Sequence, residues 1–186
     1  LARAVAPSGE AVGLDFAPRM IAYATRRHAD LANISFVVGD ALVMPFPQAS
    51  FDAAIIAFGM RNLADYGQGF AELRRVVRPG GRVVCLEIAR RHTAVSRVAA
   101  VWFDHVVPLL GRVVGYGDAY AYLVRSAKAY PSPERIAEIM TDVGLADVRW
   151  FSLFPGIVTA HVGVAEARRA APSSSHPVAV ARGSGE

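Results

Sequence analysis

The sequence lacks several features that would each place it in a particular class of protein. It has a single cysteine, Cys85, so no disulfide framework can form, and we expect a reducing, cytosolic setting. Its histidine and cysteine residues have no spacing typical of a metal site, so no bound metal is expected. The longest apolar stretch, Val95 to Tyr116, is interrupted by charged residues such as Arg97 and Asp104, which excludes a membrane-spanning helix.

Long runs of basic residues are also absent. Lys128 is the only lysine, and the net charge of +4 comes from arginines scattered along the chain. A surface that follows a nucleic-acid backbone needs clustered cations, so we expect no nucleic-acid partner. With 53% apolar and 19% charged residues, the composition is that of a globular protein. We expect one domain over residues 1–165 and a disordered tail over 166–186, which is small, polar and rich in serine.

Short apolar runs alternate with helical patterns through most of the chain. This order predicts an α/β fold with a doubly wound, mostly parallel sheet and helices on both faces. A helix capped by Ser132 is expected to end at Gly144, and the two strands around Pro155-Gly156 form an antiparallel hairpin. The four earlier strands are predicted at Ala11–Leu14, Ile34–Val38, Phe51–Phe58 and Arg82–Ile88, with a turn at Arg78–Gly81 before the last of them.

Two acidic residues follow predicted parallel strands, where ligands of such sheets bind. Asp15 can accept both hydroxyl protons of a ribose, and Asp40 can accept a hydrogen bond from an adenine amino group. Sites for NAD use the same device as Asp15. Each residue also has a purely structural interpretation: Asp15 as an acid at a helix N-terminus, and Asp40 as a turn residue that binds its own backbone.

Three segments of the sequence match the signatures of one known family. They are Phe58-Gly-Met-Arg-Asn62, Arg75–Ala89 and Gly156-Ile-Val-Thr-Ala-His-Val-Gly163. In these segments the chain resembles the quinol C-methyltransferases of menaquinone and ubiquinone synthesis. It departs from the family pattern at Arg78, where lysine is usual, and at Ala89, where serine is usual.

The resemblance extends from about Val12 to Gly163 and implies a Rossmann-like class I methyltransferase fold. It implies S-adenosylmethionine as the cofactor and a polyprenylated quinol as the acceptor. The acceptor is either demethylmenaquinol or the methoxy-benzoquinol of ubiquinone synthesis, with the first favoured. By the same resemblance, the cofactor contacts are Asp15 for the ribose, Asp40 and Ala41 for the adenine, and Ala57, which stands where the family usually has a serine.

The catalytic candidates follow from the chemistry of a quinol ring. A ring carbon next to a deprotonated hydroxyl is strongly nucleophilic, so the protein has to align the reactants and favour deprotonation. Arg61 and Asn62 are predicted to hold the quinol oxygens, with Arg61 favouring the phenolate. The alternative for Arg61 is a surface ion pair. Tyr122 either lines the quinol pocket or packs in the core. Glu87 either orients the substrate, acts as a base or caps a helix. His161 is either a proton relay or a structural histidine, and the structural role is the commoner one.

In this family a strand and a glycine-rich loop precede the first strand seen here. We expect the chain to start after them, which leaves the strands at 11–14 and 51–58 each with an unpaired edge. Low stability and weak cofactor binding are then expected. Two other functions are compatible with parts of the sequence: an NAD-dependent dehydrogenase, which does not account for Arg61-Asn62, and a non-catalytic or partner-binding remnant of the family. The stretch Val95–Tyr116 either packs on the sheet, the favoured interpretation, or covers a prenyl chain or touches the inner face of the membrane.

Overall fold

The computed structural model describes residues 1–88, 117–153 and 158–166. Several features used above lie outside these ranges. They are Ala89, the stretch Val95–Tyr116, Gly156 and the tail from residue 167 onward. Among the described residues, no helix is both long enough and apolar enough to span a bilayer.

The N-terminal part forms a small sheet of two parallel strands. A short helix, α1 (Ala2–Val5), precedes β1 (Ala11–Asp15), which pairs with β2 (Ile34–Val38) in the register Ala11 to Ile34 and Asp15 to Val38. The strands are connected by α2 (Pro18–Arg27), and Pro18 occupies its first turn, where a missing N–H costs no hydrogen bond.

The second sheet has four strands in the order β3-β4-β6-β5. Strand β3 (Phe51–Ala57) runs parallel to β4 (Val77–Ile88). Strand β6 (Val158–Ala165) is antiparallel both to β4 and to β5 (Leu145–Leu153). The predicted antiparallel pairing of the two closing strands is therefore confirmed.

The start of β4 differs from the prediction. The segment Arg78–Gly81 was expected to be a turn before the strand, but β4 already begins at Val77. The register with β3 shifts between Phe51 and Ala53, which takes up the extra residues. Gly80 has a φ of +84°, which favours glycine, and a side chain at Gly81 would clash with the carbonyl oxygen of Asp52. Both glycines are therefore needed for the backbone of β4 to lie this close to β3.

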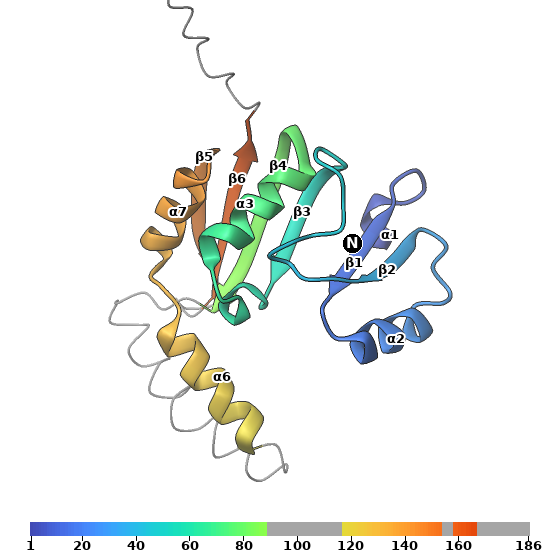
Figure 1. The fold of residues 1–186 in the computed structure, drawn as a ribbon, viewed down its shortest axis with the longest axis horizontal. Coiled ribbons are helices and arrows are strands. Elements are labelled where there is room, and N and C mark those ends of the chain that lie inside the picture. Colours follow the sequence, from blue (N-terminus) through green and yellow to red (C-terminus); the bar gives the residue numbers. More distant parts are fainter. Residues whose placement is uncertain (89–116, 154–157, 167–186) are drawn as a thin grey trace, which may run out of the picture.

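The two sheets do not join. Within the described residues, β1 pairs only with β2 and β3 only with β4, so each has a second edge without a strand beside it, as the sequence predicted (Figure 1). The link between the sheets is the loop from Gly39 to Ser50, which is held on α3 (Tyr66–Val76). Arg75 donates to the carbonyl oxygens of Phe46 and Met44, at 2.8 and 3.0 Å.

The hydrophobic core lies between the four-stranded sheet and two helices, α3 and α7 (Pro133–Asp142). Ser132 caps α7 by accepting a hydrogen bond from the Arg135 backbone, and Gly144 follows its end with a φ of +85°; both were predicted. Helix α6 (Gly117–Ala129) joins the sheet through a smaller cluster of Ile88, Val124 and Ala127. The fully buried side chains of the main core include Met60, Phe70, Val83, Ile136 and Met140.

Candidate active site at the end of strand β3

A short 3-10 helix, η1 (Met60–Asn62), follows β3 and carries two of the predicted catalytic residues. The chain leaves the strand through Phe58, whose φ of 55° lies in the left-handed region that side chains rarely adopt. Met60 is fully buried in the core and anchors η1. This anchoring places Arg61 beside the end of the neighbouring strand, β4.

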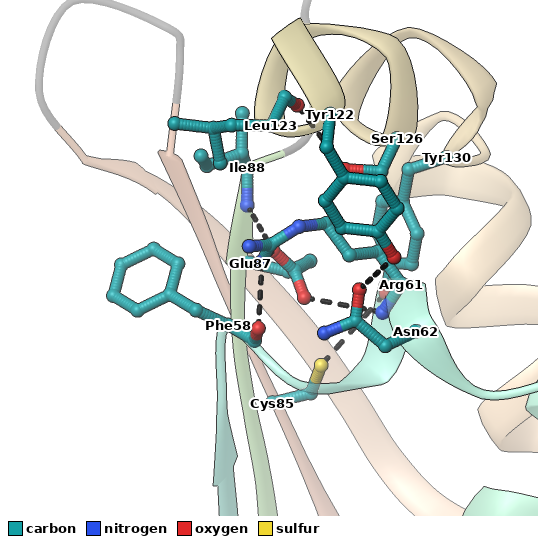
Figure 2. A network of polar contacts seen from close by, with 10 residues as sticks. All are labelled: Phe58, Arg61, Asn62, Cys85, Glu87, Ile88, Tyr122, Leu123, Ser126 and Tyr130. Carbon is teal, nitrogen blue, oxygen red and sulfur yellow. Dashed lines mark hydrogen bonds and ion pairs between the residues drawn. The ribbon is translucent and has the colours of Figure 1, made fainter. Parts of the chain in front are cut away.

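Arg61 forms a buried ion pair with Glu87 of β4 (Figure 2). The guanidinium Nη1 lies 2.6 Å from Glu87 Oε1, and the Arg61 backbone N–H donates to Oε2 at 3.2 Å. The Ile88 backbone N–H donates to Oε1 at 2.8 Å. The Glu87 side chain is 0% exposed and that of Arg61 only 10%. Glu87 is thus enclosed by donors of the protein itself.

Two further hydrogen bonds hold the side chains of Arg61 and Asn62 in place. Arg61 Nη1 also donates to the Phe58 carbonyl oxygen at 2.7 Å. The Tyr122 hydroxyl of α6 donates to Asn62 Oδ1 at 2.8 Å, so that Tyr122 lies over Asn62 (Figure 2). Arg61 Nε is buried and has no hydrogen-bond partner in the described residues. The structure therefore brings Arg61, Asn62 and Glu87 together, and adds Tyr122, which the sequence marked only as a possible pocket residue.

Three further ionisable side chains lie beneath this cluster. The rings of Tyr66 and Tyr130 meet edge to face at 5.4 Å, and the Tyr130 hydroxyl lies 3.9 Å from Cys85 Sγ. Burial raises the pKa of Cys85 to about 12 and moves the pKa of both tyrosines upward, with the charge of Glu87 adding to each. These groups stay protonated at neutral pH. No sequence pattern linked Tyr66 to the site.

His161 lies on β6, fully buried, with Nε2 2.9 Å from the Pro133 carbonyl oxygen. A carbonyl oxygen only accepts, so Nε2 carries the proton, and Nδ1 has no partner in the described residues. Burial lowers the pKa of His161 and keeps the ring neutral. The contact ties the start of α7 to the sheet, which favours the structural interpretation over a proton relay.

The predicted cofactor residues lie mainly on the small sheet. Asp15 is the last residue of β1 and Asp40 lies just beyond the end of the neighbouring β2. Each carboxylate accepts a hydrogen bond from a backbone N–H two residues ahead, that of Ala17 and Leu42, both at 2.8 Å. Each carboxylate therefore stabilises its own turn through Oδ1. Neither of these two hydrogen bonds uses the second carboxylate oxygen, Oδ2. Phe16, directly after Asp15, is 79% exposed and offers an apolar ring beside these acids.

Carboxylate oxygens that accept hydrogen bonds from hydroxyl and amino groups, next to an exposed ring, suit an adenosine, so these residues fit the cofactor expected from the sequence. Ala41 follows Asp40 in the loop after β2, whereas Ala57 lies exposed at the end of β3 on the other sheet. Among the described residues, no hydrogen bond or ion pair joins Asp15, Asp40 or Ala41 to the cluster around Arg61.

Comparison with known proteins decides the family. Residues 1–165 match the sequence profile of the ubiE/COQ5 methyltransferase family. The chain belongs to this family. The predicted resemblance is confirmed, and with it S-adenosylmethionine as the cofactor that the family uses.

Two relatives illustrate how far the similarity extends. The demethylmenaquinone methyltransferase of Thermus thermophilus is 44% identical over 161 residues, which are 85% of this chain and 73% of the relative. The enzyme of the same name from Deinococcus radiodurans is 45% identical, over 85% of this chain and 66% of its own length. The chain thus matches about two thirds to three quarters of these proteins.

Solved structures agree on the fold of this ubiE/COQ5 family member. A SAM-dependent methyltransferase from Aquifex aeolicus superposes with a TM-score of 0.59 at 15% identity, covering 87% of this chain and 72% of that one. The CMeT domain of the citrinin polyketide synthase gives 0.65 at 14% identity, over 88% and 41% of the two chains. The predicted class I methyltransferase fold is confirmed, and an NAD-dependent dehydrogenase is not supported.

Proposed function

We propose that this protein transfers a methyl group from S-adenosylmethionine to a ring carbon of a polyprenylated quinol, converting demethylmenaquinol to menaquinol. The observation that carries the proposal is the Arg61–Asn62 pair, fixed at the end of β3 by Glu87 and Tyr122. The similarity to two enzymes named demethylmenaquinone methyltransferase supports this acceptor over the methoxy-benzoquinol of ubiquinone synthesis.

The residues of the site suit this chemistry. The cofactor supplies a methyl group on a positively charged sulfur, which is already a strong electrophile. The protein then has to orient the ring, exclude water and favour loss of the hydroxyl proton. In our proposal Arg61 and Asn62 hold a ring oxygen, and the charge of Arg61 stabilises the phenolate that makes the adjacent carbon nucleophilic.

The cofactor is assigned to the small sheet on the same basis. Asp15 would hold the ribose, and Asp40 with Ala41 would hold the adenine, since these groups lie together at the ends of β1 and β2. Ala57, at the end of β3, would face the cofactor from the other sheet. Because a polyprenyl chain partitions into lipid, we propose that the protein works in the cytoplasm at the inner face of the membrane.

A methyl-transfer assay tests the proposal. Purified protein is incubated with isotopically labelled S-adenosylmethionine and either demethylmenaquinol or the methoxy-benzoquinol. The products are separated by chromatography, and the label is detected by mass spectrometry. We expect label in menaquinol, at a rate at least about 100-fold lower in Arg61→Ala. A protein that binds both ligands and transfers no label to either quinol would support the non-catalytic alternative.

A further inference from the structure

The free hydrogen-bonding groups of Arg61 and Asn62 are mainly N–H donors. Of the Arg61 guanidinium, only Nη1 is engaged among the described residues, with Glu87 and Phe58, while Nε is buried without a partner and Nη2 donates to none of them. The one oxygen of Asn62, Oδ1, already accepts from the Tyr122 hydroxyl, which leaves both Nδ2 hydrogens and a single lone pair. Donors therefore predominate in what the two side chains offer.

Glu87 does not add an acceptor to this set. Three protein N–H groups share its two oxygens: Arg61 Nη1 and the Ile88 backbone on Oε1, and the Arg61 backbone on Oε2. The side chain is completely buried. A carboxylate enclosed in this way is placed to hold the guanidinium, and not to take a proton from a bound molecule.

A site in which donors predominate distinguishes between the oxygens of a bound ring. A phenol hydroxyl needs an acceptor for its hydrogen, and neither the guanidinium nor the Nδ2 group offers one. A phenolate oxygen accepts only, and its hydrogen bonds with a guanidinium are strengthened by charge. An ether oxygen also accepts but carries no charge.

We propose that Glu87 and Tyr122 are positioning residues that leave Arg61 and Asn62 mainly as N–H donors, so that the site selects an acceptor ring with a phenolate oxygen over the same ring with a hydroxyl or ether oxygen. The inference rests on the proposed function, because it specifies the ionised form of that acceptor. No side chain of the protein then has to act as the base.

The reaction balances without such a base. The hydroxyl proton of the acceptor passes to water. A carbon–carbon bond forms from the electrons of the phenolate ring as the carbon–sulfur bond breaks, which leaves a neutral thioether. The methylated carbon then releases its own hydrogen as a proton to water, while the oxygen takes a proton back from water, so that one proton is released overall.

The surroundings of Arg61 allow a clean pH test. Cys85, Tyr66 and Tyr130 have pKa values raised by burial and stay protonated through the neutral range. Among the described residues, the titratable and charged groups linked to Arg61 by direct contact or through one another are Glu87 and Cys85 of β4, Tyr66 of α3, Tyr122 and Arg125 of α6, and Tyr130 beyond it. The roles of Glu87 and Tyr122 are tested by their own variants.

The experiment compares two probes that differ only at one oxygen. They are a naphthol whose electron-withdrawing substituent brings its pKa to about 7, and the methyl ether of the same naphthol. Binding to the purified protein, without cofactor, is measured by titration from about pH 6 to about pH 9. We expect the affinity for the naphthol to rise about 10-fold or more, and that for the ether to stay constant. A naphthol that binds no better than its ether at the upper pH overturns the proposal.

Two variants test the positioning roles, each with a matched control. Glu87→Gln and Tyr122→Phe should each lower the naphthol-to-ether affinity ratio about 5-fold or more and leave the ether affinity unchanged. Glu72→Gln makes the same chemical change in the Glu72–Arg75 pair on α3, and Tyr23→Phe removes an exposed hydroxyl on α2. Both controls should keep the ratio of the unaltered protein.

Other outcomes have a clear meaning. If Glu87 is instead a base, Glu87→Gln should lower kcat about 100-fold or more at an unchanged affinity ratio, which overturns the proposal. If Glu87→Gln does not fold, as judged by circular dichroism, an unchanged ratio in Tyr122→Phe is sufficient to overturn it. Phenolate selection in a protein that methylates no quinol would refute the proposed function and leave this inference standing.

Discussion

The two regions of the molecule differ most in how they are packed. The region of β1, α2 and β2 contains no fully buried residue, and apolar side chains such as Phe16 and Met20 are more than half exposed. The four-stranded sheet with α3 and α7 encloses Phe70, Ile136 and Met140 completely. Both regions are built from similar short apolar strands, so the difference comes from what covers them.

This difference separates the two halves of the proposed site. The residues assigned to the cofactor, Asp15 and Asp40, lie on the region without a core, whereas Arg61, Asn62 and Glu87 lie on the packed one. Burial stabilises by roughly 25 cal/mol per Å² of apolar surface, so the small sheet gains little from its own packing. The part of the site assigned to the quinol is therefore held by the core of the four-stranded sheet. The part assigned to the cofactor depends on contacts beyond its own packing.

The largest expected effect of this contrast is on stability. Phe70→Ala removes a fully buried ring and should lower the free energy of unfolding by about 3–5 kcal/mol, measured by urea denaturation. Ile21→Ala, at a half-buried position of α2, should cost about 1 kcal/mol. Equal losses in the two variants would contradict the contrast between the regions.

Hydrogen exchange tests the difference between the two sheets for each strand separately. We expect the backbone amides of β1 and β2 to exchange at least about 100-fold faster than the paired amides of β4 and β6, because local opening of the small sheet exposes little apolar surface. Exchange can be followed by NMR or mass spectrometry. Similar protection in both sheets would show that they open as one unit.

The smallest effect concerns pH and should be confined to the packed region. Burial lowers the pKa of His161, so the unfolded chain binds a proton there more readily than the folded protein. The free energy of unfolding should keep its full value above the unfolded pKa of about 6.5 and fall as the pH drops below it, by at most about 1.4 kcal/mol per pH unit. In His161→Gln, which keeps a donor for the Pro133 carbonyl but does not titrate, the fall should be smaller. An identical fall in both proteins would exclude His161 as its source.

Much of the fold could be predicted from local pattern. Alternating apolar runs indicated the strands, Ser132 marked the start of α7, and the short connection predicted that β5 and β6 pair antiparallel. These features depend on residues that are close in the sequence. The early start of β4 at Val77 was missed because Pro-Gly-Gly is typical of a turn, and only the pairing of Val77 with Phe51, across a shift in register, makes these residues part of the strand.

The site was predictable as a set of positions and not as a set of contacts. Arg61 and Glu87 were each singled out, but no pattern indicated that they pair, because their 26-residue separation is closed only by the register of β3 on β4. The same holds for Tyr122, which reaches Asn62 from a helix 60 positions away in the chain. Long-range pairing of this kind is a property of the assembled sheet.

The position of Cys85 has a practical consequence for measuring local opening of the two sheets. Its thiol is completely buried at the centre of the packed region, and its raised pKa of about 12 leaves almost no reactive thiolate at neutral pH. The sequence has no other sulfhydryl group. Labelling by a thiol reagent therefore reports the opening of the four-stranded sheet alone. Opening of the β1–β2 region does not expose this thiol and is not detected.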